Sequence, residues 1–311
     1  MHPSVQINPV QAFSCYPDQD EIDRWVSELI KRAASTPVTG EELEVSPVTQ
    51  SFGNNPNTLE NRFICFHTDD HNFYGYWQPA PKAPSPLIVN LPGYGGFISN
   101  HPQICDDGYH ILHISPLGYV TPFGMNHDCL MEDGNWPVLD FTARGMKDGY
   151  EDWLLDCLLA IRWARAQPCV ISDRISLFGT SQGGGASLLL ASILQDSIRC
   201  VCADLPFLTA FPLSELKGDA YGILQNSFLE TDSATFWRNL GYIDTLSHTH
   251  RLHIPVMLSA GGKDNVCPVR CVEELFRRLS TTKQYSYLQD TTHTHSRESM
   301  FLFRSWLALF A

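Results

Sequence analysis

The stretch ISLFGTSQGGG, residues 175–185, decides the fold. It begins as an apolar run typical of a buried strand and passes through Gly-x-Ser-x-Gly into small and apolar residues typical of a helix. A nucleophile on a tight strand-to-helix turn needs neighbours without bulk two residues on either side, and Gly179 and Gly183 satisfy that need. The pattern predicts an exposed nucleophile at Ser181, with the N–H of Gln182 at the helix start as a donor to a developing oxyanion. Gly-x-Ser-x-Gly also arises by chance, but the strand, turn and helix around it favour the functional interpretation.

The rest of the chain alternates between strand and helix patterns from residue 86 onward. Short apolar runs lie at 86–91, 109–114, 175–179, 200–205, 255–260 and 285–288, and helical patterns lie at 149–166, 182–194, 269–279 and 296–310. Strands covered on both sides and followed by helices predict the α/β class, with a mostly parallel central sheet and helices on both faces.

The N-terminal part has a different pattern. Residues 18–34 predict an amphipathic helix, and 61–67 with 72–78 predict a β-hairpin. The turn of this hairpin is rich in histidine and aspartate (His67, Asp69, Asp70, His71), which suggests either a metal site or a polar turn, and we favour the turn. We expect an appendage over 1–80 packed on a catalytic domain over 81–311, as one structural unit.

A serine nucleophile needs a base, and the base needs an acid that orients it. In this architecture the chain order is Ser, then Asp or Glu, then His. Asp264 follows the buried run 255–260, where that order requires the acid. The alternative is that Asp264 only caps the helix that begins near Pro268.

Two histidines follow the last predicted strand. His293 is the preferred base, because His295 lies closer to the final helix and is expected to flank its N-terminus. Asp290 is a competing acid, but it lies only three residues from His293 and is expected to shape the turn.

The second oxyanion donor is expected in the glycine-rich loop after the run 86–91. Glycines at 93, 95 and 96 allow the backbone to turn an N–H inward, and Tyr94 is the candidate. A glycine-rich loop can also bind phosphate, but the chain has no Gly-x-x-x-x-Gly-Lys-Ser/Thr and no Gly-x-Gly-x-x-Gly before a helix, so nucleotide binding is not expected.

The composition excludes several other functions. The 311 residues contain 21 Lys+Arg against 34 Asp+Glu, a formal charge of −13, which opposes binding to nucleic acid and to anionic membranes. No apolar run is long enough to span a membrane, and the first residues lack the pattern of a secretory signal. The ten cysteines form no Cys-x-x-Cys pair and no zinc-site spacing, and in a chain of this size without an export signal we expect reduced thiols and a cytoplasmic location. The serine mechanism implies no metal or other cofactor.

Several segments in the same order resemble the acetyl xylan esterases and cephalosporin C deacetylases, which form carbohydrate esterase family seven of the α/β-hydrolases. The similar segments are residues 179–185 (the elbow), 203–208 (ADLPFL), 240–244 (LGYID), 262–268 (GKDNVCP) and 142–148 (TARGMKD). The resemblance implies the α/β-hydrolase fold, a triad of Ser181, Asp264 and His293, and an oxyanion hole formed by the amides of Tyr94 and Gln182. It also implies that Pro206 and Phe207 border a small acyl pocket.

The chain departs from this family at four places. Pro92 replaces the histidine of His-Gly-Tyr, residues 115–119 (SPLGY) replace Asp-x-Arg-Gly-Gln-Gly, and Thr294 replaces the glutamate of His-Glu. Segment 119–141 differs from the loop that supports a hexameric ring in the family, so a homo-oligomer remains one possible assembly.

The resemblance and the residues together predict a serine esterase that removes acetyl groups from a small neutral ester such as a carbohydrate. A broad carboxylesterase or a peptidase on the same triad is the alternative among enzymes. A binding module without catalysis is the alternative outside them.

Overall fold

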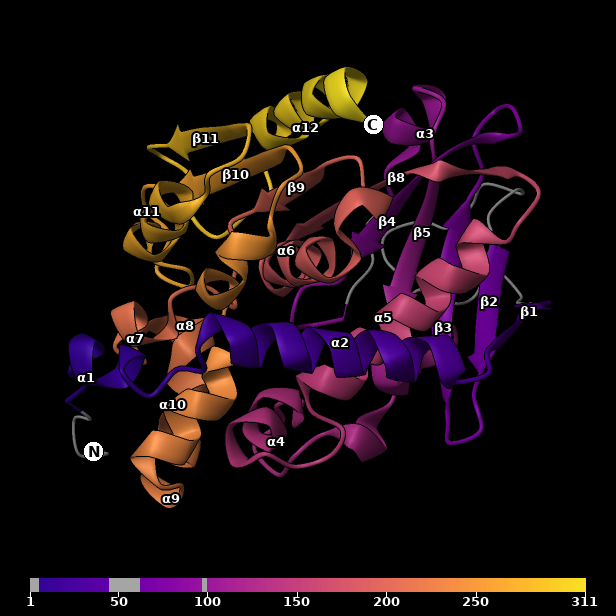
Figure 1. The fold of residues 1–311 in the computed structure, drawn as a ribbon. Coiled ribbons are helices and arrows are strands. Elements are labelled where there is room, and N and C mark those ends of the chain that lie inside the picture. Colours follow the sequence, from indigo (N-terminus) through magenta and orange to yellow (C-terminus); the bar gives the residue numbers. More distant parts are fainter. Residues whose placement is uncertain (1–5, 45–61, 97–99) are drawn as a thin grey trace.

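The computed structural model describes residues 6–44, 62–96 and 100–311. In these ranges a nine-stranded sheet has the order β1-β2-β3-β5-β4-β8-β9-β10-β11, and β6 with β7 forms a separate pair (Figure 1). The strands are β1 (Thr39–Leu43), β2 (Arg62–His67), β3 (Asn72–Gln78), β4 (Ser85–Leu91), β5 (His110–Ser115), β6 (Val120–Thr121), β7 (Gly124–Met125), β8 (Val170–Thr180), β9 (Val201–Asp204), β10 (Val256–Gly261) and β11 (Lys283–Leu288). From β5 to β11 along the sheet every neighbouring pair is parallel. The predicted mostly parallel sheet is therefore confirmed.

Helices lie on both faces of this sheet, as predicted. They are α1 (Pro9–Phe13), α2 (Gln19–Ser35), α3 (Pro102–Asp106), α4 (Val138–Arg144), α5 (Tyr150–Arg165), α6 (Gln182–Leu194), α7 (Phe211–Ser214), α8 (Gly218–Tyr221), α9 (Gln225–Glu230), α10 (Ser233–Gly241), α11 (Val269–Arg278) and α12 (Arg297–Phe310). One hydrophobic cluster joins the sheet to α2, α5, α6 and α11, and a second joins the opposite face to α3 and α12. The inner strands β4, β5, β9 and β10 are thus buried on both sides, which explains their continuous apolar runs.

The N-terminal hairpin is part of the sheet. Strands β2 and β3 pair antiparallel, and β3 continues the sheet by pairing antiparallel with β5. The turn between them is closed by a hydrogen bond from the Thr68 N–H to the His71 carbonyl at 3.1 Å. Across the described ranges, no three His, Cys, Asp or Glu side chains are arranged to hold a metal ion. The hydrogen bonding of the sheet continues across residue 80, since β3 pairs with β5. The division at this residue into an appendage and a catalytic domain stays a prediction.

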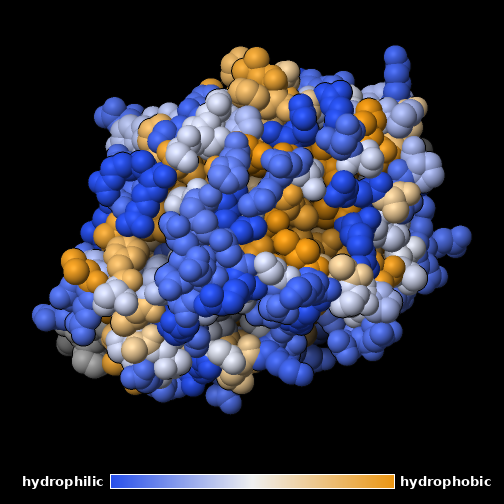
Figure 2. Space-filling view, in the orientation of Figure 1, coloured by the Kyte–Doolittle hydropathy of each residue, from blue (hydrophilic) through white to orange (hydrophobic). Residues whose placement is uncertain are grey.

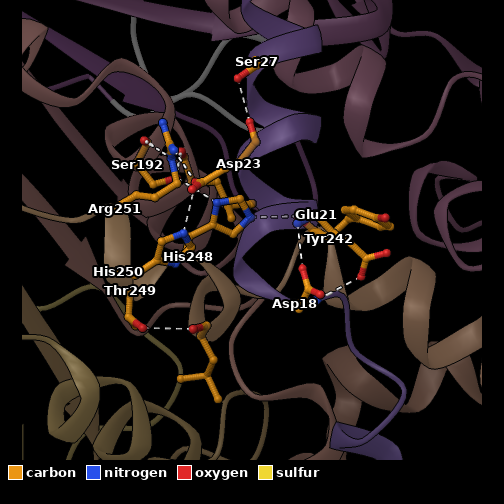
Figure 3. Close-up of polar contacts among 12 residues, drawn as sticks. Asp18, Glu21, Asp23, Ser27, Ser192, Tyr242, His248, Thr249, His250 and Arg251 are labelled. Atoms are coloured by element: carbon orange, nitrogen blue, oxygen red, sulfur yellow. Dashed lines mark hydrogen bonds and ion pairs between the residues drawn. The ribbon is translucent and has the colours of Figure 1, made fainter.

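Helix α2 is fastened to the segment before β10 by polar contacts (Figure 3). The Asp23 carboxylate accepts hydrogen bonds from Arg251 and from His250 Nε2, the latter at 3.1 Å. Arg251 Nε also donates to the Ser192 carbonyl at 3.1 Å, and His248 Nδ1 lies 3.0 Å from Ser192 Oγ. The N-terminal helix, the end of α6 and residues 245–251 are therefore held as one body.

The surface next to α2 is apolar. Figure 2 shows hydrophobic residues gathered on this face, where a cavity of about 490 Å³ is lined by side chains of α2 and α5, including Ile30, Leu158 and Ile161. No helix in the described ranges is both long and apolar enough to cross a membrane.

Candidate active site

Ser181 lies on the sharp turn between β8 and α6. Its backbone has φ 59° and ψ −121°, a conformation that L residues rarely adopt. A Cβ on Gly183 would lie 2.1 Å from the Leu91 carbonyl oxygen, and a Cβ on Gly179 would lie 2.4 Å from the Gly183 carbonyl carbon. The two glycines thus allow β8, β4 and the start of α6 to approach closely enough to form the turn that the sequence predicts.

Asp264 and His293 come together after β10 and β11. The Oδ2 atom of Asp264 lies 2.8 Å from Nδ1 of His293, and its Oδ1 accepts the backbone N–H groups of Val266 and Cys267, both at 2.8 Å. Since a carboxylate only accepts, the proton of a neutral His293 lies on Nδ1, and Nε2 is free to accept another. Asp264 does not cap α11: the N-cap residue of this helix is Pro268, and the helix has no side-chain cap.

The competing residues have other partners. His295 Nδ1 lies 2.7 Å from Oδ2 of the buried Asp204, and its Nε2 is buried without a partner among the described residues. Asp290 forms an exposed ion pair with Lys263 at 2.7 Å. The structure therefore brings Asp264 to His293 and directs both alternatives elsewhere.

Ser181 and His293 line the same cavity, which has a volume of about 390 Å³. The other lining residues are Gly93, Tyr94, Gly95, Asn135, Thr180, Phe207, Asp219, Ala220, Ile223 and Val266. Ser181, Asp264, His293 and Tyr94 each follow the carboxyl end of a parallel strand, which is where ligands bind in sheets of this type.

Of the two predicted oxyanion donors, Tyr94 lines the cavity with Ser181, and Gln182 directly follows Ser181 at the start of α6. Within the described part of the chain, the backbone N–H groups of Tyr94 and Gln182 have no hydrogen-bond partner. The side chains of both residues are held elsewhere: Tyr94 Oη donates to the Trp136 carbonyl at 2.8 Å, and Gln182 Oε1 accepts from Tyr150 Oη at 2.5 Å. Burial raises the pKa of both tyrosines. These hydrogen bonds hold the loop and the helix start in place, and the role of the two amides as oxyanion donors stays a prediction.

An aromatic ring forms part of the cavity wall. Phe207 packs edge-on against Phe211 and Tyr221, with ring centroids 5.8 and 4.7 Å apart. Pro206, also predicted at the pocket, is buried but is not among the lining residues. Asp219 and Asn135 line the cavity without having been predicted, because neither lies in a motif or beside a strand end.

The comparisons with known proteins agree with these features. The sequence profile of the acetyl xylan esterase (AXE1) family matches residues 66–305. The chain belongs to the acetyl xylan esterase family. The resemblance that the sequence suggests is therefore confirmed.

The chain is similar to a curated relative, the acetyl esterase Axe7A of Xylanibacter ruminicola, with 24% identity over 294 residues. The alignment covers 86% of this chain but only 64% of the length of that relative.

Two solved structures have the same fold over almost the whole chain. Acetyl xylan esterase 1 from Thermoanaerobacterium sp. JW/SL YS485 has a TM-score of 0.75 at 18% identity, and the match covers 94% of each chain. The acetyl xylan esterase from Paenibacillus sp. R4 has a TM-score of 0.76 at 18% identity, covering 97% of this chain and 99% of that one. They confirm the α/β-hydrolase fold.

Proposed function

We propose that the protein is a serine esterase that removes acetyl or other short acyl groups from small neutral esters, carbohydrate esters among them. The observation that carries this proposal is the convergence in one cavity of Ser181 and His293, with His293 held by the buried Asp264. The membership of the acetyl xylan esterase family supports the same chemistry.

The proposed reaction has two steps. Ser181 Oγ attacks the ester carbonyl while His293 Nε2 takes its proton, and the amides of Tyr94 and Gln182 stabilise the oxyanion. Collapse breaks the bond to the alcohol, which leaves with the proton from His293, and an acetyl-enzyme remains. Water then attacks the acetyl group with His293 as base, and acetate leaves as Ser181 recovers its proton. Asp264 orients His293 and stabilises its protonated form in both steps.

The charges around the cavity support a neutral substrate. Its lining contains the carboxylate of Asp219 and, among the described residues, no lysine or arginine. Such a lining repels an anionic ester and offers no positive charge that could pair with it.

A reducing, cytoplasmic location is part of the proposal. All ten cysteines are free in the structure, and six of them are buried among apolar residues of the two hydrophobic clusters (Cys105, Cys157, Cys200, Cys202, Cys267, Cys271). Free thiols are typical of proteins that stay in a reducing compartment.

The test compares the wild-type protein with Ser181→Ala on p-nitrophenyl acetate, butyrate and octanoate, on acetylated xylo-oligosaccharides and on a p-nitroanilide. We expect acetate to be the best substrate and the variant to lose about 10⁴- to 10⁶-fold in kcat. A variant within about tenfold of wild type would overturn the mechanism. Faster turnover of octanoate would indicate a broad carboxylesterase, turnover of the anilide a peptidase, and no turnover at all a binding module.

A further inference from the structure

A second histidine–aspartate pair lies next to the first. His295 Nδ1 is 2.7 Å from Asp204 Oδ2, and the Asp204 side chain is fully buried. Thr180 Oγ1 donates to the same oxygen at 3.1 Å, and Ser259 Oγ donates to the other. The carboxylate therefore receives donors from the end of β8, from β10 and from the loop that carries His293.

Asp204 also holds the nucleophile through its backbone. The N–H of Ser181 donates to the Asp204 carbonyl at 2.8 Å. A Cβ on Gly184 would lie 2.9 Å from the same oxygen, so the start of α6 packs directly on the end of β9. One buried residue is thus bonded both to the turn with Ser181 and, through His295, to the loop with His293.

His295 is not placed to exchange protons with a substrate. Its Nδ1 is bonded to Asp204, its Nε2 is buried, and it does not line the cavity. Its ring lies near those of Phe178, Phe303 and His101, with centroids 6.4, 5.9 and 6.2 Å away. A side chain in this setting affects the reaction only through the position of its neighbours.

We propose that His295 is a positioning residue: its bond to Asp204 fixes the loop that holds His293 beside Ser181. The inference rests on the proposed esterase function. His293 and His295 are two residues apart, and two residues of extended chain span at most about 7 Å, so an anchored His295 leaves His293 little freedom. Misplacing a reacting group by about 1 Å lowers rates by about 10²-fold.

The test uses two variants of nearly equal shape in the full-length protein. His295→Asn keeps an amide N–H at the position of Nδ1, whereas His295→Leu has the same branching but no donor. With p-nitrophenyl acetate we expect His295→Leu to lose about 10- to 100-fold in kcat with KM within about twofold of wild type. His295→Asn is expected to stay within about threefold of the wild-type kcat.

The control is His71→Leu, because His71 Nε2 also lies 2.8 Å from a buried carboxylate, that of Asp156, but neither residue lines the cavity. It reports the effect of losing such a pair on folding alone, and its kcat is expected to equal that of wild type. The inference is wrong if His295→Leu stays within twofold of wild type, if His295→Asn falls as far as His295→Leu, or if His71→Leu loses the same factor. An inactive wild-type protein would instead overturn the proposed function and this inference with it.

Discussion

The carboxylate of Asp264 divides its two oxygens between two tasks: Oδ2 faces His293 Nδ1 at 2.8 Å, and Oδ1 accepts two backbone N–H groups of its own loop. The loop therefore dictates which oxygen faces the histidine. The Asp264 side chain is wholly buried, whereas the His293 side chain is 17% exposed, so water does not compete for the carboxylate that holds Nδ1.

This division predicts the effect of Asp264→Asn. The amide oxygen is expected to keep the two backbone N–H groups, which leaves the NH₂ group facing Nδ1 of His293. As a donor, this NH₂ group stabilises the His293 tautomer that carries its proton on Nε2. In that tautomer Nε2 cannot take the proton of Ser181. We expect kcat to fall about 10⁴-fold, as the same change does in serine proteases, with little change in the thermal unfolding midpoint. Activity within about tenfold of wild type would show that Asp264 does not orient the base.

The glycines of the elbow predict a strong effect of Gly183→Ala. The added methyl group would lie 2.1 Å from the Leu91 carbonyl oxygen, and backbone cannot move aside as a flexible side chain does. Overpacking of this kind destabilises a protein by about 1–3 kcal/mol or more. Denaturant unfolding measures the loss, and kcat is expected to fall with it because Leu91 leads into the Tyr94 loop.

Gly222→Ala is the matched control for this variant. Its Cβ would meet only the Leu216 carbonyl oxygen, at an ordinary 3.9 Å, and its φ of −63° suits any residue. We expect its stability to stay within about 0.5 kcal/mol of wild type. Equal stability of the two alanine variants would contradict the tight-turn argument.

Much of the fold could be predicted because its strands are covered on both faces. The helices over 150–165 and 182–194 and the strand over 256–261 lie within one or two residues of the predicted ranges. Strand β8 was predicted too short: it begins at Val170, not at 175, because residues 172–174 are exposed and break the apolar run. Strand β1 was missed, since most of its residues are polar and it joins the edge of the sheet by pairing with β2.

In the candidate site, too, some features could be predicted from the sequence and others could not. Ser181, Asp264 and His293 each follow an apolar run, so a local pattern indicates where the chain brings them. The Asp204–His295 bond joins residues 91 positions apart, and only the three-dimensional packing of β9 against the last loop creates it. A sequence-level signal existed for Asp204 alone, as a charged residue at the end of a buried strand.

Phe207 is expected to set the acyl-chain preference. Its ring is buried, packs against two other aromatic rings and lines the cavity, so a long acyl chain must displace packed structure. We expect kcat/KM to fall about tenfold to a few hundredfold from acetate to hexanoate, and Phe207→Ala to flatten this series. Phe236→Ala, which truncates another buried ring away from the cavity, is the control for lost stability and should keep the wild-type series. An unchanged series in Phe207→Ala would show that this ring is not the wall.

Asp219 is expected to select against anionic substrates. Its carboxylate is exposed at the cavity, where water and salt screen it, so its effect on one substrate charge is at most about 1 kcal/mol. Asp219→Asn should therefore raise kcat/KM for an acetyl ester with an anionic alcohol about two- to fivefold and leave a neutral ester unchanged. The gain should shrink in about 1 M salt. Equal gains for both esters would exclude an electrostatic cause.

His248 is expected to make the fold sensitive to acid. The side chain is fully buried, and burial lowers its pKa from 6.5 to about 4, although the hydrogen bond to the Tyr242 carbonyl at 2.9 Å opposes this shift. A histidine with a lowered pKa is neutral in the folded state while the unfolded chain still takes up a proton. Its contribution to stability is therefore complete above pH 6.5 and is lost as the pH falls from 6.5 to 4, by about 3 kcal/mol.

His248→Gln separates this contribution from that of the other acid-sensitive groups. The glutamine amide is expected to keep the bond to the Tyr242 carbonyl without any group that titrates, so the variant loses some stability at pH 7 but less on acidification. The free energy of unfolding in denaturant, measured at pH 7 and at pH 4.5, should fall by about 2 to 3 kcal/mol less in the variant than in wild type. The buried His101, with its pKa lowered to about 3 by burial and by the nearby His295, acts equally in both proteins and cancels in this difference. If both proteins lose the same free energy between the two pH values, His248 takes up its proton in the folded state as readily as in the unfolded one, and the sensitivity to acid has another origin.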